Sequence, residues 1–312
     1  MTQTAKGIAE PVAVLCGGRS AEREVSLRSG AAVLKALQQR GYRALALDAA
    51  EDLPDQLRRH GIATAFLALH GRQGEDGTVQ GLLEIMGIPY TGSGVLASAL
   101  AMDKAMAKQI VAAAGVATPA ARLLEASADE AACIAFCQQQ TRWPCVVKPV
   151  REGSTLGISL VRQGGALAEA VAQARRYDRR VLVEDYIAGR EVTVAVLCGE
   201  ALPIVEVQAP QGFYDYQAKY TPGQTNYLVP APLEAGCYRA IQQAAVRSSQ
   251  ALGCRGAVRI DFMVAEEAFY FLEANTIPGM TETSLLPKAA ACTGMDFADL
   301  VERLLADASL DR

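Results

Sequence analysis

Short runs of hydrophobic residues recur along the chain, and polar or amphipathic stretches separate them. Residues 12–15, 45–47 and 64–69 have the apolar pattern of buried strands. Residues 29–39, which follow the first of these runs, have a helical pattern. Because strands that alternate with helical or loop segments are typical of parallel sheets, we predict a parallel α/β layer in residues 1–95.

The remainder of the chain is predicted to form antiparallel hairpins joined by helices. Residues 145–149 and 158–161 are strands separated by a flap of small and charged residues at 150–157. A second hairpin consists of residues 256–264 and 268–274. Further strands are expected at 181–184 and 191–196, and further helices at 98–114, 166–176 and 233–252. We therefore predict an N-terminal α/β domain (1–95), a central domain (96–185) and a C-terminal domain (186–312).

Composition narrows the class of protein. With 312 residues, the chain is longer than one hydrophobic core usually serves, which agrees with a multidomain prediction. Hydrophobic residues make up 51% and charged residues 21%, so the protein is expected to be ordered and globular. The net charge of -4 and the pI of about 5.4 give no electrostatic support for nucleic-acid binding, and they favour a small-molecule partner.

Other classes of site and location are disfavoured. The mean hydropathy is +0.12, but no uncharged apolar run approaches the roughly 18 residues that span a bilayer, so we expect no membrane association. The first ten residues lack the pattern of a secretory signal, which predicts a cytoplasmic protein. The eight cysteines form no C-x-x-C pair and there are only two histidines, so neither a zinc site nor a disulfide framework is predicted.

The second hairpin carries polar residues within otherwise apolar strands. Glu273 and Asn275 are two positions apart, so they leave the same strand face roughly 6.6 Å apart, and Asp261 can face them from the partner strand. Carboxylate and amide oxygens suit Mg²⁺ better than zinc. Either the side chains converge on one ion or two ions lie between them, and two ions fit the spacing more easily. The alternative is a solvated strand face.

Lys148 ends an apolar strand directly before the flap. A buried ammonium needs an anion, and a nucleotide phosphate is one candidate, which backbone N–H groups of the flap can also contact. The alternative is a lysine that reaches water from the strand end. The chain contains neither G-x-x-x-x-G-K-[ST] nor G-x-G-x-x-G, so phosphates, if bound, are not held by a P-loop or a dinucleotide fingerprint.

Three further features lie at strand ends or turns. Glu22 and Glu24 precede the first helix, where acids are also favoured by the helix dipole alone. His70 begins a loop, 70–77, at the edge where α/β sheets bind ligands, although an isolated histidine is more often an ordinary loop residue. The turn at 275–281 places backbone N–H groups beside the predicted metal site, a position that suits an oxyanion.

Seven segments, in order and at compatible spacing, resemble the D-alanine–D-alanine ligases of the ATP-grasp superfamily. They are GGRSAEREVS (17–26), LHGRQGEDGT (69–78), MDK (102–104), VVKPVREGSTLG (146–157), YDYQAKY (214–220), GAVRIDF (256–262) and LEANTIPGMT (272–281). The resemblance implies an ATP-grasp fold of class α/β and α+β, in which an N-terminal parallel α/β domain that binds substrate is followed by two antiparallel-sheet domains that clamp ATP. The last of these, the C-terminal domain, would also bind the metal.

The resemblance also implies roles for individual residues. The ATP-binding residues would be Lys104, Lys148, Glu184, Tyr186 and Glu191. The ligands of two Mg²⁺ ions, with Mn²⁺ as a possible substitute, would be Asp261, Glu273 and Asn275. Glu22 would hold the ammonium of the first D-alanine, with Ser154 and Tyr220 as a closing latch. His70 and Lys219 would be further substrate contacts. Arg259 and Gly279 would stabilise the oxyanion. Ser284 and Leu285 would contact the second D-alanine.

The implied reaction converts a carboxylate into an acyl phosphate with ATP, because a free carboxylate is a poor acyl donor, and the amine of a second D-alanine then attacks. A homodimer is implied on the same basis. Two alternatives stay open: an ATP-grasp ligase for another amino or hydroxy acid, and a non-catalytic nucleotide-binding sensor. A nucleotide-linked dehydrogenase is disfavoured by the missing glycine fingerprint.

Overall fold

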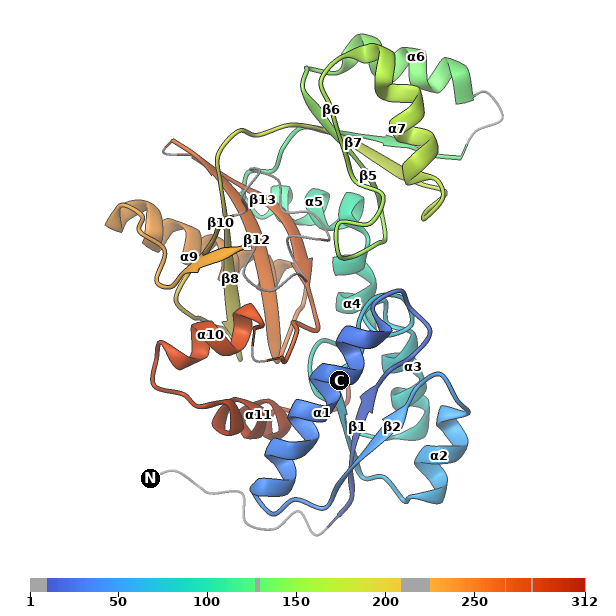
Figure 1. Cartoon of the computed structure of the whole chain (residues 1–312), viewed down its shortest axis with the longest axis vertical. Helices are drawn as coiled ribbons and strands as arrows, with labels where there is room; N and C mark the ends of the chain where they lie inside the picture. Colours follow the sequence, from blue (N-terminus) through green and yellow to red (C-terminus); the bar gives the residue numbers. More distant parts are fainter. Residues whose placement is uncertain (1–9, 127–129, 209–224, 267, 282, 312) are drawn as a thin grey trace.

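Three sheets organise the part of the chain that the computed structural model describes, which is residues 10–126, 130–208, 225–266, 268–281 and 283–311 (Figure 1). The first sheet is parallel, with strand order β2-β1-β3. β1 is buried at all five positions, as its continuous apolar run predicts. The parallel α/β layer expected at the N-terminus is therefore confirmed. Its elements are β1 (Val12–Cys16), α1 (Arg23–Gln39), β2 (Ala44–Asp48), α2 (Leu53–Arg59), β3 (Thr64–Leu67) and α3 (Thr78–Met86).

The second sheet has four antiparallel strands in the order β4-β7-β5-β6. Its apolar face packs against α7, and Leu167 and Val171 are fully buried there. The predicted hairpin with a flap corresponds to β5 and β6, which pair antiparallel. The elements are β4 (Ala121–Leu124), α6 (Glu130–Gln140), β5 (Cys145–Pro149), β6 (Ser159–Val161), the 3₁₀ turn η1 (Gly164–Ala166), α7 (Leu167–Ala174) and β7 (Val181–Asp185).

The third sheet has six strands, with the main order β11-β10-β8-β12-β13 and β9 paired to β8. All its pairings are antiparallel. The predicted hairpin around residue 266 is confirmed as β12 and β13. The elements are β8 (Arg190–Leu197), β9 (Glu200–Ala201), β10 (Val205–Gln208), β11 (Asn226–Leu228), α9 (Ala235–Ala251), β12 (Ala257–Ala265), β13 (Ala268–Asn275), α10 (Leu285–Ala291) and α11 (Phe297–Ala306).

The two faces of the six-stranded sheet have different roles. Alternate residues of β8, namely Val192, Val194 and Val196, enter a core with the helices that cover one face. The intervening residues Glu191 and Thr193 lie on the opposite face, because successive side chains of a strand alternate. On that opposite face, Glu191 and Asp261 line a pocket together with residues of the four-stranded sheet.

The prediction of one alanine-rich helix at 98–114 is wrong. The structure has two helices, α4 (Val95–Met102) and α5 (Lys104–Ala113), which are separated at Asp103. Asp103 is extended, with φ -84° and ψ 95°, and its side chain accepts a hydrogen bond from the backbone N–H of Met106. Arg180 also donates to this carboxylate. Asp103 thus acts as an N-cap, and the break reorients α5 relative to α4.

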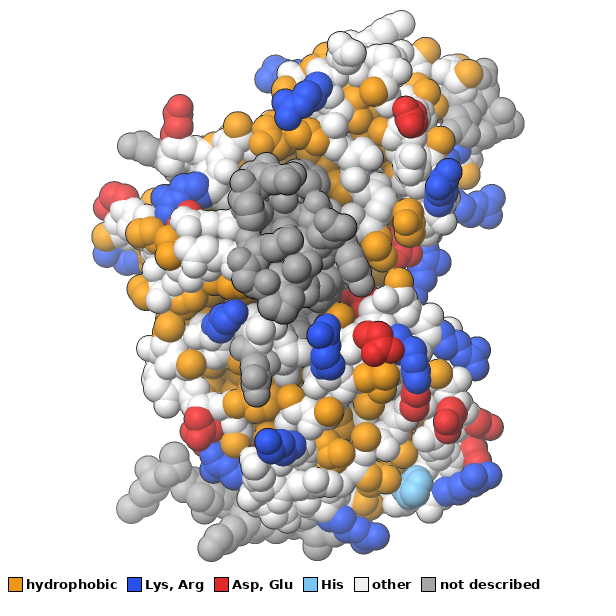
Figure 2. Space-filling model, in the orientation of Figure 1, with side chains coloured by type: hydrophobic (Ala, Val, Ile, Leu, Met, Phe, Trp, Pro, Cys, Tyr) orange, Lys and Arg blue, Asp and Glu red, His pale blue; other side chains and the backbone are white. Residues whose placement is uncertain are grey.

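The end of the chain returns to the N-terminal elements. Ser309 bridges to Tyr90, and the carboxylate of Asp311 accepts a hydrogen bond from the backbone N–H of Val95 at 3.1 Å. One hydrophobic core joins α1 to α10 and α11. Basic and acidic side chains are interspersed over the face drawn in Figure 2. Within the described residues, the structure contains no helix with the length and apolar character of a membrane span.

Candidate active site

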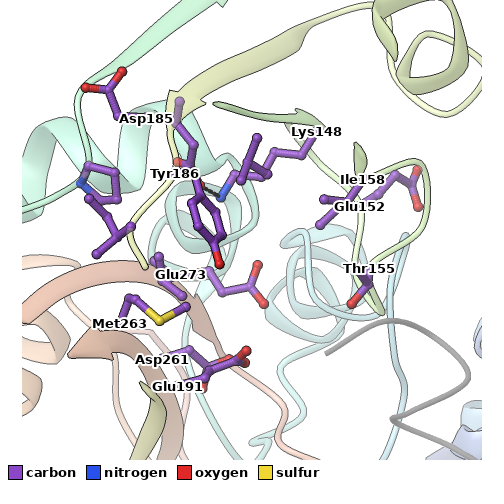
Figure 3. A pocket seen from close by; sticks show the side chains of 15 residues that line it. Lys148, Glu152, Thr155, Ile158, Asp185, Tyr186, Glu191, Asp261, Met263 and Glu273 are labelled. Carbon is purple, nitrogen blue, oxygen red and sulfur yellow. Dashed lines mark hydrogen bonds and ion pairs between the residues drawn. The ribbon is translucent and has the colours of Figure 1, made fainter. Parts of the chain in front are cut away.

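Two adjoining pockets lie between the sheets. We call the first the hinge pocket, because it contains the segment that connects β7 to β8. It is lined by Pro119, Val146, Lys148, Glu152, Thr155, Ile158, Glu184, Asp185, Tyr186, Ile187, Glu191, Asp261, Met263, Leu272 and Glu273. Figure 3 shows side chains from both sheets turned toward one space: Lys148 enters from above, and Asp261 and Glu273 lie below it.

We call the second the turn pocket, because residues within 277–281 and 283–286 form much of its wall. Its polar lining combines carboxylates, cations and hydroxyl groups. The lining residues are Glu22, Val25, Arg28, His70, Glu75, Gly153, Ser154, Thr225, Tyr227, Arg259, Glu273, Asn275, Ile277, Pro278, Gly279, Thr281, Thr283, Ser284, Leu285, Leu286 and Lys288. Glu273 is the one described residue that lines both pockets, so its carboxylate marks their junction.

The β12–β13 hairpin positions the acids of this junction. Asp261 lies directly opposite Glu273 in the strand register, and Arg259 lies opposite Asn275. The register shifts between Asp261 and Phe262, so Leu272 is the additional residue of a β-bulge. Because of the bulge, the neighbours Leu272 and Glu273 both line the hinge pocket.

The carboxylate of Asp261 is held by three side chains. Arg259 makes two hydrogen bonds of 2.9 Å to it, from Nε to Oδ1 and from Nη2 to Oδ2. Thr193 donates to Oδ1 at 2.6 Å, and the amide nitrogen of Asn275 donates to Oδ2 at 3.2 Å. The amide oxygen of Asn275 is therefore left for another partner. This network fixes a buried carboxylate, 6% exposed, on the floor of the cleft.

The oxygen atoms at the junction are of the types that bind a hard cation. Asp261 and Glu273 offer carboxylate oxygens, and Asn275 adds an amide oxygen, the ligand types that Mg²⁺ prefers. Among the described residues there is no group of three or more His, Cys, Asp or Glu side chains that could hold a metal. A metal bound here would thus depend on the amide and on oxygens supplied by a ligand.

Glu184 lies between two lysines in the wall of the hinge pocket. Lys148 donates to Oε1 at 2.6 Å, and Lys108, from α5, donates to Oε2 at 2.7 Å. All three residues are about 5% exposed or less. Burial alone would raise the pKa of Glu184, but the two ammonium groups outweigh it, so the pKa is lowered and the carboxylate stays ionised.

Lys104 connects the junction to the flap between β5 and β6. Its Nζ donates to the backbone carbonyl of Glu152 at 2.6 Å and lies 3.2 Å from Oε2 of Glu273. The Glu152 side chain accepts a 2.7 Å hydrogen bond from Arg72, which also donates to the carbonyl of Tyr177 at 2.7 Å. Burial raises the pKa of Glu152, and Arg72 opposes this change. The flap is thereby attached to the N-terminal layer.

The flap also separates the two pockets. Glu152 and Thr155 line the hinge pocket, whereas Gly153 and Ser154 line the turn pocket. Ser154 and Thr155 have φ of 51° and 62°, a left-handed backbone that non-glycine residues rarely adopt. The hydroxyl of Ser154 donates to Oε1 of Glu22. Strain of this kind is maintained only where surrounding contacts hold it, and it is common at ligand sites.

His70 and Glu75 lie near Glu22 at the N-terminal end of the turn pocket. His70 is buried, and its Nε2 is 3.3 Å from the hydroxyl of Ser29. Burial lowers the pKa of His70, the charge of Arg259 lowers it further, and Glu22 opposes the change. The imidazole is therefore favoured in its neutral form.

Glu75 accepts hydrogen bonds from the backbone N–H groups of Gly71 at 2.8 Å and Ile277 at 3.4 Å. It thereby ties the loop after β3 to the turn that follows β13. Burial, together with the charge of Glu22, raises the pKa of Glu75 to about 8. Sequence reasoning noted this loop but gave Glu75 no role.

The turn after β13 is organised around Ser284. The Ser284 hydroxyl accepts a hydrogen bond from the backbone N–H of Thr281 at 3.0 Å. A Cβ atom at Gly279 would lie only 2.7 Å from this hydroxyl oxygen, so a larger residue there would displace the Ser284 side chain or the turn. Met280 donates its backbone N–H to Ser29 at 3.3 Å, which fixes the turn against α1.

The structure gathers the predicted site residues that it describes. Those at the hinge pocket are Lys148, Glu184, Tyr186, Glu191, Asp261 and Glu273, and those at the turn pocket are Glu22, His70, Ser154, Arg259, Glu273, Asn275, Gly279, Ser284 and Leu285. Lys104 lines neither pocket but contacts Glu273. Lys219 and Tyr220 lie outside the described residues. Sequence reasoning missed Glu75, Lys108, Thr193 and Leu272; of these, Lys108 carries a signal, because it follows Lys104 by one helical turn.

Known proteins that are similar to this chain match nearly all of its length. Residues 46–93 match the family model for the D-ala D-ala ligase N-terminus, and residues 110–306 match the model for the C-terminus. A D-alanine–D-alanine ligase from Syntrophotalea carbinolica is 57% identical over 299 residues, covering 96% of this chain and 96% of that protein. One from Geotalea uraniireducens is 52% identical over 300 residues, with 96% of each chain covered.

Solved structures with the same fold give a consistent comparison. The D-alanine–D-alanine ligase from Bacillus anthracis complexed with ATP has a TM-score of 0.82 and 32% identity, covering 96% of this chain and 97% of that chain. The VanG D-Ala:D-Ser ligase from Enterococcus faecalis has a TM-score of 0.82 and 30% identity, covering 95% and 98%. The ATP-grasp fold expected from the sequence motifs is therefore confirmed.

Proposed function

Because the chain belongs to the D-alanine–D-alanine ligase family, we propose that it joins two D-alanines into D-alanyl-D-alanine with ATP, for peptidoglycan precursor synthesis. The activity is that of an ATP-dependent carboxylate–amine ligase. ADP and phosphate are the other products, and an acyl phosphate is the intermediate.

One observation carries the assignment of the site: the hinge pocket and the turn pocket meet at Glu273. The reaction needs a nucleotide whose terminal phosphate reaches the carboxylate of a second small molecule. Two adjoining pockets with a shared acidic junction provide this arrangement. We assign ATP to the hinge pocket and the two D-alanines to the turn pocket.

The charges in each pocket support this assignment. Lys148 in the hinge pocket, with Lys104 beside the junction, provides cations for the phosphate chain. In the turn pocket, Glu22 provides a carboxylate for the ammonium group of the first D-alanine. Arg259 reaches the junction from the strand opposite Asn275 and supplies positive charge where a tetrahedral oxyanion forms.

Magnesium belongs to the proposal. Asp261, Glu273 and Asn275 would hold it, and, when bound, it would neutralise charge on the phosphate oxygens during transfer. Arg259 and Thr193 orient the Asp261 carboxylate independently of any ion.

Positioning of the substrates is a second contribution to the rate. Holding two small substrates beside the nucleotide lowers the barrier by on the order of 7 to 11 kcal/mol, because the entropy loss is avoided in the reaction step.

The flap has a protective role in the proposed reaction. An acyl phosphate reacts with water, so the junction must be closed during turnover. The flap lies over the junction through the Lys104–Glu152 contact and reaches Glu22 through Ser154. Lys219 and Tyr220 remain proposed as further substrate contacts on the family resemblance.

The decisive experiment measures phosphate release from ATP with D-alanine alone, with L-alanine alone, and with D-alanine plus D-serine or D-lactate as the second substrate. We expect D-alanine to stimulate release strongly, with one phosphate formed per dipeptide, and L-alanine to have no effect. ATP binding without amino-acid-dependent phosphate release would instead identify a nucleotide sensor. Higher activity with D-serine or D-lactate as acceptor would identify a ligase of different acceptor specificity.

Two finer points complete the proposal. We place the enzyme in the cytoplasm, where ATP is available.

We also propose that the protein is a homodimer. Ile85 on α3 and Leu96 on α4 are 87% and 68% exposed, and they offer apolar surface for a contact between two copies. Light scattering of the purified chain tests the dimer, since a monomeric mass at micromolar concentration contradicts it.

A further inference from the structure

Lys108 is a buried cation that contacts Glu184 but is not among the described residues that line the hinge pocket. It belongs to α5, one helical turn after Lys104, so the two lysines leave the same face of the helix. Its side chain is 6% exposed. Neither the sequence motifs nor the proposed reaction gives this lysine a role.

Glu184 divides its carboxylate between two ammonium groups, with Lys148 on Oε1 and Lys108 on Oε2. One carboxylate between two cations leaves an excess of one positive charge. Of the three residues, Lys148 and Glu184 reach the pocket wall. A pair of Glu184 and Lys148 alone would be neutral overall, and it would attract an anionic phosphate chain much less strongly.

Stability alone does not explain this trio. A buried ion pair contributes little net stability, because each charge loses its hydration. A third buried charge adds to that loss. The excess positive charge of the trio lies at the wall of the hinge pocket, where it would stabilise an anionic ligand.

We propose that Lys108 is a positioning residue for the nucleotide: by sharing the carboxylate of Glu184, it leaves the ammonium of Lys148 able to bind the phosphate chain. This inference rests on the proposed function, since it takes the hinge pocket as the ATP site. Lys108 does not touch the nucleotide and acts through Glu184 and Lys148.

The titration of Lys108 provides a way to switch this effect. The charged groups that face its ammonium are Glu184, Lys148 and Asp185. Burial, and to a smaller extent the charge of Lys148, lowers the pKa of Lys108, whereas Glu184 and Asp185 oppose the change; the resulting pKa is about 8. Lys108 therefore loses its proton as the pH rises through about 8, and the trio then loses its excess positive charge.

Calorimetric titration of the full chain with ATP and with adenosine tests the proposal. At pH 7 we expect Lys108→Met to weaken ATP binding by about tenfold or more, because a buried charge-assisted contact is lost and Lys148 is neutralised by Glu184. Adenosine lacks phosphates, so its affinity should not change. Lys108→Arg, which keeps a positive charge beside Glu184, should retain most of the ATP affinity.

The pH dependence gives a second readout. ATP affinity of the wild type should fall between pH 7 and 9.5, while Lys108→Met should bind weakly at both ends of this range. Equal loss of ATP and adenosine affinity in Lys108→Met would overturn the proposal, because it would indicate a merely structural role. Unchanged ATP affinity in this variant would also overturn the proposal. The proposed function is tested separately, because it requires only that the wild type binds ATP and releases phosphate when D-alanine is present.

Discussion

The hydroxyl of Ser154 donates a hydrogen bond to the carboxylate of Glu22, which lies 132 positions earlier in the chain. This contact joins the flap of the four-stranded sheet to the start of α1, and both residues line the turn pocket. The Glu22 carboxylate is also close to two glycines, since a Cβ atom at Gly71 or Gly153 would lie 3.0 or 2.9 Å from Oε2. The packing around Glu22 thus depends on a hydroxyl and on two positions without side chains.

Loss of the Ser154 hydroxyl should impair use of D-alanine more than binding of ATP. We expect Ser154→Ala to lower kcat/KM for D-alanine by about ten- to a hundredfold, because a hydrogen bond to a charged group is lost. Steady-state kinetics with each substrate varied in turn measures this split. Ser154→Gly is the matched control, since glycine accepts the positive φ without strain. If the glycine variant keeps full activity, the hydroxyl has no role and the backbone conformation alone matters.

A methyl group at Gly153 should disturb the same contact from the backbone side. In Gly153→Ala the new Cβ would lie 2.9 Å from Glu22 Oε2, so either the flap or the carboxylate must move. We expect a severalfold or greater loss of kcat/KM for D-alanine. Gly165→Ala serves as control, because a Cβ atom there meets no atom within 4 Å. Equal activity of the two variants would mean that the flap tolerates displacement.

Periodicity in the sequence was sufficient to predict the acidic hairpin. Alternating apolar positions fix which side chains leave each strand face, so Asp261 could be predicted to face Glu273 and Asn275, and the structure pairs it with Glu273. The bulge that adds Leu272 to the pocket could not be predicted, since it changes the register by one residue without a distinctive residue type. The domain boundaries at 95 and 185 remain predictions.

Contacts between segments that are distant in the sequence could not be predicted from the sequence pattern. Lys108 and Glu184 are 76 positions apart, and their ion pair depends on how α5, which packs on the six-stranded sheet, approaches β7 of the four-stranded sheet. The break at Asp103 was missed for a related reason: alanines on both sides have high helix propensity, and the capping contact that overrides them is a property of the folded chain. The family motifs identified most of the site because they encode such contacts.

Removal of the negative charge at the junction should stop the reaction without unfolding the protein. We expect Glu273→Gln to reduce phosphate release by about a hundredfold or more, because charge stabilisation at the transferring phosphate is lost. Half-saturation by Mg²⁺ should move to a higher concentration in the same assay. Glu266→Gln, in the exposed turn of the same hairpin, controls for the loss of one acid. Full activity of Glu273→Gln at ordinary Mg²⁺ concentrations would refute the metal assignment.

The raised pKa of Glu75 predicts a specific pH dependence of stability. Its pKa is about 8 in the folded protein, above its ordinary value of 4.5, so the folded chain holds this proton more tightly than the unfolded chain. The resulting stabilisation is complete below about pH 4.5 and is lost as the pH rises through about 8. It changes by at most about 1.4 kcal/mol per pH unit for one group.

Substitution of Glu75 by glutamine should remove this dependence, because the amide stays neutral at every pH. Urea titrations between pH 5 and 9 measure the free energy of unfolding of both proteins. We expect the difference between Glu75→Gln and the wild type to change in favour of the variant as the pH rises, and to become constant above about pH 8. Glu24→Gln, on the exposed side of α1, controls for the change in net charge. Parallel curves for the wild type and Glu75→Gln would show that Glu75 ionises in the folded protein as it does in the unfolded chain.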